Sequence, residues 1–321
     1  MTWGGDAPLC TGPGGIMRRA RRRAADALLR HSPLQLAFRA ASTRRLAVLA
    51  YHGVDDPVSF AAQLERLAST ANPVSLAQVE RAVTEGRPLP LRSVLVTFDD
   101  GDRSLLTHGL PALIRNRIPA AAYVIPQLIG SDQPFWWTEA AELAGSGGRT
   151  ALGALAPGAL VARLKRLPDA ERLTALEELR ATAAAPAPRT PQLTAQELFV
   201  LREGGVAIGN HTMTHPCLDR CADDTLRTEI AEAHTMLTGW LGAPPTTFAY
   251  PNGNHDPRAE QLLRELGYRL AFLFDHRHDR LLPASPLRIS RLRVNSHTGR
   301  ARFDTILSGL HPTVHRMRGG V

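Results

Sequence analysis

The sequence has few cysteines, one lysine and no long apolar run. Cys10, Cys217 and Cys221 are too few in 321 residues for a disulfide framework, which favours a reducing compartment. No run of 18 or more apolar residues is present, and the start lacks the charged-then-apolar order of a secretory signal. We therefore expect neither a transmembrane helix nor a signal peptide, and a cytoplasmic location.

Net charge is also scarce outside the first 45 residues. Nine arginines stand there against Asp6 and Asp26, so this start carries +7 of the net charge of +8. The nearly neutral remainder argues against a basic groove along the body, and hence against a nucleic-acid partner. Lys165 is the only lysine; every other member of the Lys/Arg set is an arginine.

The arginine-rich start forms a separate extension, residues 1–45. Its first 16 residues are rich in glycine and predict no regular structure, so the true start is either Met1 or Met17. Residues 18–31 predict a basic helix that stops at Pro33. Because the apolar face of this helix is thin, a weak contact with a membrane surface and a dangling or packed cap both remain open.

The body alternates between short apolar runs and helical patterns. The runs predict strands at 46–51, 93–98, 120–125, 206–208, 247–250, 268–274 and 287–294, and the patterns predict helices at 60–68, 76–84, 225–241 and 258–266. Strands separated by helices pair in parallel through crossover connections, which indicates an α/β barrel or an open doubly wound sheet.

One segment, residues 131–191, interrupts this alternation. It holds an aromatic patch at 135–137, a glycine-rich bend, a charged helix around 160–184 and an Ala/Pro linker. We interpret it as a lid inserted into a single catalytic domain, 46–300, and covering one mouth of the barrel. Residues 301–321 read as a polar C-terminal tail.

Two carboxylates follow the strand 93–98 directly. Asp99 and Asp100 precede Gly101, which permits a turn. Active sites of parallel sheets and barrels are built at this end of the strands. Neighbouring residues there point in different directions, so one carboxylate can bind a metal while the other faces the substrate water. Alone, the same triplet is more often an ordinary acidic turn.

Two histidines follow another strand end. His211 and His215 come after the run 206–208, and a spacing of four places them on one face if the segment is a helical turn. Two histidines and one carboxylate form a common ligand set for zinc or another divalent ion. Cys217 and Cys221 offer a His/Cys zinc site as an alternative, although packing within a following helix is the simpler interpretation.

Three motifs carry a family resemblance. Thr97-Phe98-Asp99-Asp100-Gly101 and His211-Thr212-Met213-Thr214-His215 resemble the first two motifs of polysaccharide deacetylases of the NodB-homology type. Residues 248–253, Phe-Ala-Tyr-Pro-Asn-Gly, resemble the third, and Tyr51-His52-Gly53-Val54 resembles the first strand of many members. The resemblance spans about Leu46 to Val294 and implies a distorted (β/α) barrel with about seven parallel strands.

The resemblance implies a role for each matching residue. Asp99 would be the general base, Asp100, His211 and His215 would hold the metal, and the backbone N–H of Asn252 would stabilise the oxyanion. The metal would be a divalent ion, with Zn²⁺ expected first and Co²⁺ or Ni²⁺ as alternatives. Tyr250, Pro251, Trp137 and His52 are candidates for substrate binding.

Two features depart from the family pattern. Many members have, in the third motif, an arginine that pairs with the catalytic aspartate, and Ala249 stands there in this chain. Orientation of Asp99 must then come from elsewhere. The general acid is a late histidine in many members, and His297 and His276 are equal candidates.

The resulting functional hypothesis is a carbohydrate N-deacetylase, a hydrolase acting on C–N bonds other than peptide bonds. Its substrate would be an N-acetylated amino sugar of the N-acetylglucosamine type in a polysaccharide, an oligosaccharide or a glycan precursor. The alternatives are a metal-dependent hydrolase of another non-peptide amide and a catalytically weak sugar-binding relative. The retained Asp99 argues against the latter.

Overall fold

A sheet of nine strands forms the centre of the molecule in a computed structural model that describes residues 13–317. Their order is β7-β6-β5-β4-β3-β1-β8, with β2 beside β3 and β9 beside β1, and only β8 is antiparallel. The strands are β1 (Arg45–Tyr51), β2 (Asn72–Pro73), β3 (Ser93–Phe98), β4 (Ala120–Val124), β5 (Val206–Asn210), β6 (Thr247–Ala249), β7 (Leu270–Phe272), β8 (Asp279–Arg280) and β9 (Leu292–Arg293).

The segment 289–293 closes this sheet. Ile289 forms a parallel bridge with Phe272 of β7, and Leu292 pairs in parallel with Leu49 of β1. Since β7 and β1 lie toward opposite ends of the strand order, the segment contacts both edges and the sheet curls into a distorted (β/α) barrel. The predicted fold class, with about seven parallel strands, is confirmed.

The central strands are apolar because they are buried on both faces. All six residues of β3 and all five of β4 are buried, as parallel strands under helices require. The covering elements are α3 (Pro57–Thr70), α4 (Leu76–Glu85), the π-helical turn η1 (Leu105–Gly109), α5 (Leu110–Asn116), α9 (Ala195–Glu203), α10 (Asp223–Leu241) and α11 (Pro257–Glu265), with 3₁₀ turns η2 (Pro126–Leu128), η3 (Leu218–Arg220), η4 (Pro251–Gly253) and η5 (Pro286–Arg288).

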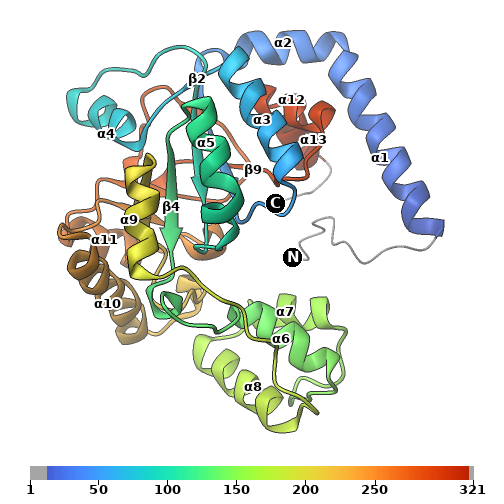
Figure 1. Ribbon diagram of the computed structural model, residues 1–321, viewed down its shortest axis with the longest axis vertical. Coiled ribbons are helices and arrows are strands. Elements are labelled where there is room, and N and C mark those ends of the chain that lie inside the picture. The colour runs from blue at the N-terminus through green and yellow to red at the C-terminus, as the bar shows by residue number, and fades with distance from the viewer. Residues whose placement is uncertain (1–12, 318–321) are drawn as a thin grey trace.

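The first and the last helices of the described residues pack together beside the barrel. They are α1 (Pro13–His31), α2 (Pro33–Ser42), α12 (Arg300–Ser308) and α13 (Leu310–Met317), and α12 lies against both α1 and α2 (Figure 1). The basic helix predicted at 18–31 ends at His31 as part of α1, and Pro33 begins the next helix, α2, behind the Ser32 cap. The residues expected to be a tail form α12 and α13 instead, with Phe303 and Ile306 buried.

The insertion forms a small helical lobe. Its helices are α6 (Trp136–Gly145), α7 (Pro157–Leu164) and α8 (Asp169–Thr182), which share an apolar cluster of their own. The single helix expected around 160–184 is divided into α7 and α8, because Pro168 cannot continue a helix and instead caps the N-terminus of α8. In Figure 1 the lobe lies beyond the carboxyl end of β4. That 131–191 acts as a lid stays a prediction.

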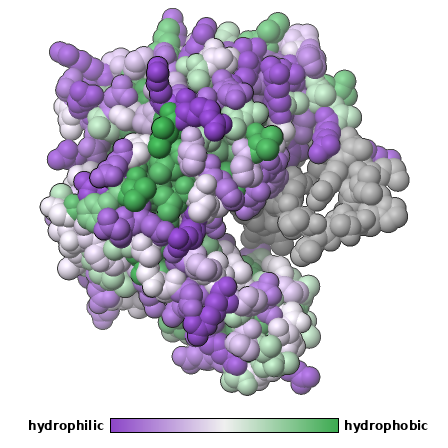
Figure 2. Space-filling view, viewed as in Figure 1, coloured by the Kyte–Doolittle hydropathy of each residue, from purple (hydrophilic) through white to green (hydrophobic). Residues whose placement is uncertain are grey.

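The surface is largely hydrophilic on the face drawn in Figure 2, with hydrophobic residues gathered over α9 and its neighbour α5. Ile114, Phe199 and Val200 of these helices are exposed. Among the described helices, none is long and apolar enough to cross a membrane. Met1 and Cys10 lie outside the described residues.

The packing of β5 gives a test of the fold. A Cβ on Gly209 would lie 2.6 Å from Tyr123 Cε1 and 2.7 Å from Thr247 Cγ2, so Gly209→Ala overpacks the barrel. We expect the free energy of unfolding to fall by about 1–3 kcal/mol, measured by denaturant titration. Gly239→Ala is the matched control, because open space surrounds Gly239 within α10 and alanine favours a helix. Equal stability of the two variants would contradict this packing.

Candidate active site

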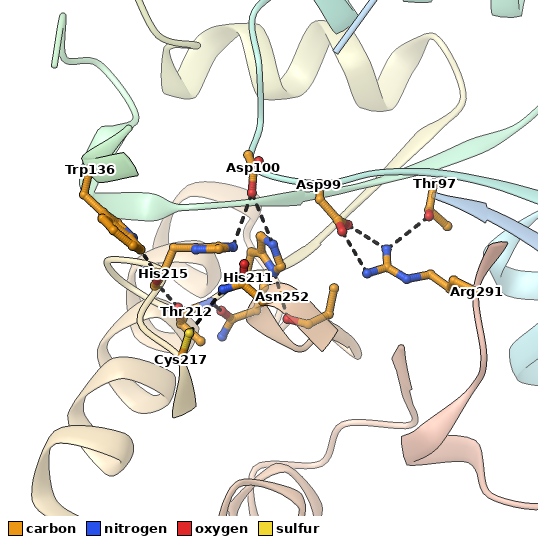
Figure 3. A network of polar contacts seen from close by, with 12 residues as sticks. Thr97, Asp99, Asp100, Trp136, His211, Thr212, His215, Cys217, Asn252 and Arg291 are labelled. Carbon is orange, nitrogen blue, oxygen red and sulfur yellow. Dashed lines mark hydrogen bonds and ion pairs between the residues drawn. The ribbon is translucent and has the colours of Figure 1, made fainter. Parts of the chain in front are cut away.

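The end of β3 directs two carboxylates apart. Asp99 continues the strand, and its N–H donates to the carbonyl oxygen of Tyr51 at 2.9 Å. Asp100 and Gly101 then adopt left-handed φ angles of 68° and 78°. This turn points Asp100 toward the histidine loop while Asp99 points toward Arg291 (Figure 3). The position of both carboxylates at a strand end was predicted from the sequence, and the turn explains why their side chains point in different directions.

The histidine pair lies in a loop and not in a helical turn. Thr212 and His215 have left-handed φ angles of 66° and 62°, which are strained for residues other than glycine. Asn210 Oδ1 accepts from the N–H of Thr212 at 2.7 Å, and Thr212 Oγ1 accepts from the N–H of His215 at 3.0 Å. These bonds offset the strain, so the loop and not helical spacing brings the two imidazoles together.

A buried glutamate of α10 holds the same loop from outside. Glu229 accepts from Thr214 Oγ1 at 2.6 Å and from the Thr214 N–H at 2.8 Å. Its carbonyl oxygen accepts from the Met213 N–H at 2.9 Å. The insertion adds a further anchor, because Trp136 Nε1 donates to the carbonyl oxygen of His215 at 3.0 Å. The loop is therefore fixed by both the barrel and the insertion.

Asp100, His211 and His215 converge on one point. One ligand atom from each lies within 4.8 Å of the others, and both imidazole Nε2 atoms lie 3.4 Å from Asp100 Oδ1. Within the described part of the chain, Asp100 Oδ1 and His215 Nδ1 are buried without a hydrogen-bond partner. Buried polar atoms without a partner are costly unless something binds them, and these three side chains are a ligand set that suits a divalent metal.

The ligand atoms have the protonation states that metal binding needs. His211 Nδ1 lies 2.8 Å from the carbonyl oxygen of Ala249; that bond requires Nδ1–H and leaves the Nε2 lone pair toward Asp100. Burial raises the pKa of Asp100, but the neighbouring imidazoles of His211, His52 and His215 outweigh it, so the net pKa lies well below its usual value. Burial and the charge of His211 lower the pKa of His215. The carboxylate is thus charged and the His215 imidazole neutral at neutral pH.

Asp99 forms a bidentate ion pair with a buried arginine. Arg291 Nη1 and Nη2 donate to the two carboxylate oxygens at 2.6 and 2.8 Å, and Nη1 also contacts Thr97 Oγ1 at 3.2 Å (Figure 3). Arg291 Nε donates to the carbonyl oxygen of Leu273 at 2.6 Å. This fork geometry fixes both the position and the rotation of the Asp99 carboxylate.

Arg291 was missed by sequence reasoning, which looked for an orienting arginine at Ala249. It comes from the closing segment 289–293 and is fully buried, with its guanidinium over Tyr123, Phe272 and Phe274. A partial signal existed, because the run 287–294 holds three arginines, Arg288, Arg291 and Arg293, and an arginine that is fully buried needs a carboxylate partner. Only the fold identifies that partner as Asp99.

Asn252 lies beside the metal-ligand loop. It has a left-handed φ of 55°, its Nδ2 lies 3.4 Å from Cys217 Sγ, and its Oδ1 accepts from Lys165 Nζ at 2.6 Å. Cys217 and Cys221 are buried free thiols on either side of η3, not in α10. Burial raises the pKa of Cys217 to about 11, so its thiol stays protonated, and it does not join the three clustered ligands.

The predicted substrate-binding residues are dispersed. Tyr250 and Pro251 are buried, and the Tyr250 hydroxyl donates to the carbonyl oxygen of Leu287 at 3.1 Å, away from the ligands. Trp137 lies against His215, with ring centroids 4.6 Å apart. His52 is half-buried and meets Phe274 edge-on at 5.4 Å, within electrostatic reach of Asp100. Their roles stay predictions.

The two acid candidates have different surroundings. His276 is buried; its Nδ1 accepts from the N–H of Arg293 at 3.0 Å and its Nε2 lies 3.2 Å from His311 Nδ1. Burial, followed by the neighbouring His311, lowers the pKa of His276 to about 2, so at neutral pH His276 is a neutral imidazole and not an imidazolium. His297 is exposed, and it interacts electrostatically with Asp56. The assignment of the general acid to His297 or His276 stays a prediction.

Comparison with protein families matches residues 86–271 to the polysaccharide deacetylase model, which is more than half of the chain. The chain belongs to the polysaccharide deacetylase family. The family and the enzyme class predicted from the motifs, a carbohydrate deacetylase, are thereby confirmed.

Individual relatives cover different parts of the chain. A poly-β-1,6-N-acetyl-D-glucosamine N-deacetylase of Escherichia coli K12 is 46% identical over 48 residues, 15% of this chain but only 7% of that protein. The Streptococcus pyogenes deacetylase PplD in complex with acetate is 17% identical with a TM-score of 0.58, covering 82% of this chain and 98% of PplD. IcaB from Ammonifex degensii is 20% identical, also with a TM-score of 0.58, and the match covers 83% of this chain and 97% of IcaB. The two structures establish similarity of fold.

The Asp99–Arg291 pair gives the second test. Arg291→Met leaves a buried carboxylate without its partner, and we expect the free energy of unfolding to fall by about 3–5 kcal/mol in denaturant titration. Asp99→Asn combined with Arg291→Met removes both charges and should recover much of that loss. A single variant as stable as the wild type, or a double variant as unstable as the single one, would contradict the pairing.

Proposed function

We propose that this deacetylase is a metal-dependent hydrolase that removes N-acetyl groups from amino sugars of the N-acetylglucosamine type. One observation carries the proposal: Asp100, His211 and His215 surround a common point, next to a second carboxylate held by an arginine. A three-ligand centre leaves coordination positions open for water and substrate. We assign to Asp99 the role of the general base that accepts the proton of the attacking water.

A divalent ion fits this ligand set. Such an ion would bind Asp100 Oδ1, which has no hydrogen-bond partner among the described residues, and the lone pair of His211 Nε2. Zinc is the metal that we propose first, because it favours histidine and carboxylate ligands, with Co²⁺ or Ni²⁺ able to replace it. When bound, the ion supplies a Lewis acid that polarises the acetyl carbonyl and lowers the pKa of a water molecule.

The chain's own residues would perform the remaining work. Asp99 takes the proton of the attacking water, and Arg291 holds the Asp99 carboxylate in its position and orientation. The backbone N–H of Asn252 donates to the carbonyl oxygen as negative charge develops on it. Cleavage of the C–N bond yields acetate and a sugar amine.

The substrate class is proposed from the relatives. The name of the E. coli relative assigns it to poly-β-1,6-N-acetyl-D-glucosamine, so β-1,6-linked N-acetylglucosamine oligomers are the substrates to examine first. The match spans only 7% of that protein, so its whole activity is not transferred. We also propose a cytoplasmic location; contact of the arginine-rich start with a membrane surface stays a prediction.

The proposed reaction is tested by acetate release. Zinc-loaded wild type should release acetate from β-1,6-linked N-acetylglucosamine oligomers, chelation should stop release, and added Zn²⁺ or Co²⁺ should restore it. Asp99→Asn should lower the rate by about 100-fold or more, because general-base catalysis contributes about 10²–10⁴-fold. Asp224→Asn is the matched control, an exposed carboxylate in the first turn of α10.

The outcomes separate the alternatives. Release that survives chelation would contradict the metal centre, and release unaffected by Asp99→Asn would contradict the base. Metal binding without release from β-1,6- or β-1,4-linked oligomers would favour hydrolysis of another amide, or sugar binding without catalysis.

A further inference from the structure

The insertion delivers a cation to the third motif. Lys165 directly follows α7, and its Nζ donates to Asn252 Oδ1 at 2.6 Å, although the two residues are 87 positions apart. The ammonium also lies 5.7 Å from the ring centroid of Trp137, which itself contacts His215. Lys165 thus connects the lobe of α6–α8 with the wall of the catalytic site.

The surroundings of Lys165 are unusual for a lysine. Its side chain is half-buried, and burial lowers its pKa. Among the described residues, no carboxylate lies within ion-pair distance of its Nζ; its hydrogen-bond acceptor is the neutral Asn252 amide. Holding a cation there costs free energy that a purely structural contact would not require.

The residue type is equally informative. Of the 38 Lys and Arg residues in the chain, all are arginines except Lys165. The planar guanidinium forks toward two acceptors, whereas an ammonium concentrates its charge on one small donor. Lys165 Nζ has a single hydrogen-bond acceptor among the described residues, Asn252 Oδ1, and this suits an ammonium.

Asn252 is a residue whose conformation needs support. Its φ of 55° and ψ of 6° place it in the left-handed region, which a side-chain-bearing residue occupies at a cost. Both ends of its side-chain amide are held, Oδ1 by Lys165 and Nδ2 by Cys217 Sγ. Releasing Oδ1 would free the side chain and, with it, the orientation of the adjoining peptide.

We propose that Lys165 is a positioning residue of the deacetylase site: by holding Asn252 Oδ1 it fixes the peptide whose N–H stabilises the oxyanion. This inference rests on the proposed function. It also gives the insertion a catalytic purpose, because the lobe then completes the carbonyl-binding side of the site.

A kinetic cycle tests the coupling. Lys165→Met keeps the length and apolar stem but loses the donor; we expect kcat to fall by about 10- to 100-fold with little change in KM, since misplacing a catalytic group by about 1 Å costs rate on this order. Lys165→Arg should restore part of kcat. Arg163→Met is the matched control, an exposed cation on α7, and should leave kcat unchanged.

The second arm of the cycle uses Asn252→Gly. Glycine accepts the left-handed φ and keeps the backbone N–H while removing Oδ1. Lys165→Met should therefore have almost no additional effect on kcat in this background. Full additivity of the two substitutions, or a wild-type kcat for Lys165→Met, would overturn the proposal while leaving acetate release by the wild type intact.

A measurement without turnover makes the two failures distinguishable. Reductive methylation with ¹³C-formaldehyde labels the single lysine and the chain's amino terminus, and Lys165→Arg identifies the terminal signal. In the zinc-loaded protein we expect the Lys165 dimethyl signal to lie away from its solvent-exposed position and to move toward it in Asn252→Gly. A signal at the exposed position in both proteins would overturn the contact, whether or not the protein releases acetate.

Discussion

The buried ion pair between Asp99 and Arg291 is the constraint on which the rest of the structure depends. Asp99 ends β3 in the middle of the sheet, and Arg291 comes from the segment 289–293 that contacts both β7 and β1. Closing the barrel therefore also assembles the site: the same step buries two charges, pairs them and aims one carboxylate. An uncompensated charge at this depth would destabilise the fold, so folding and catalytic geometry are coupled.

Much of the fold could be predicted from the sequence because parallel strands under helices are continuous apolar runs. The run 93–98 matches β3, and the helix expected at 225–241 is α10 apart from two residues at its start. The C-terminal helices were missed because their apolar residues are few and become buried only in the folded chain, where Phe303 and Ile306 join the main core and α12 packs against α1 and α2. The strand expected at 287–294 is reduced to β9 and the isolated bridge at Ile289, since its first half turns through η5.

The site was predictable where chemistry and position coincide in one motif. Asp99, Asp100, His211 and His215 follow strand ends, and parallel strands bring such ends together. Arg291 and Lys165 were not predictable as partners, because their contacts with Asp99 and Asn252 span 192 and 87 positions and depend on barrel closure and on the insertion. The histidine spacing suggested a helical turn, whereas two left-handed residues produce the same convergence.

The position of the metal tests the central claim most directly. Crystals of the zinc-loaded protein, measured at the zinc absorption edge, should show one strong anomalous peak about 2.0–2.2 Å from Asp100, His211 Nε2 and a ring nitrogen of His215, with Asp99 still paired to Arg291. A peak among His276, His311 and His315, a peak at the Cys217 thiol, or no peak between Asp100 and the two histidines would contradict the account.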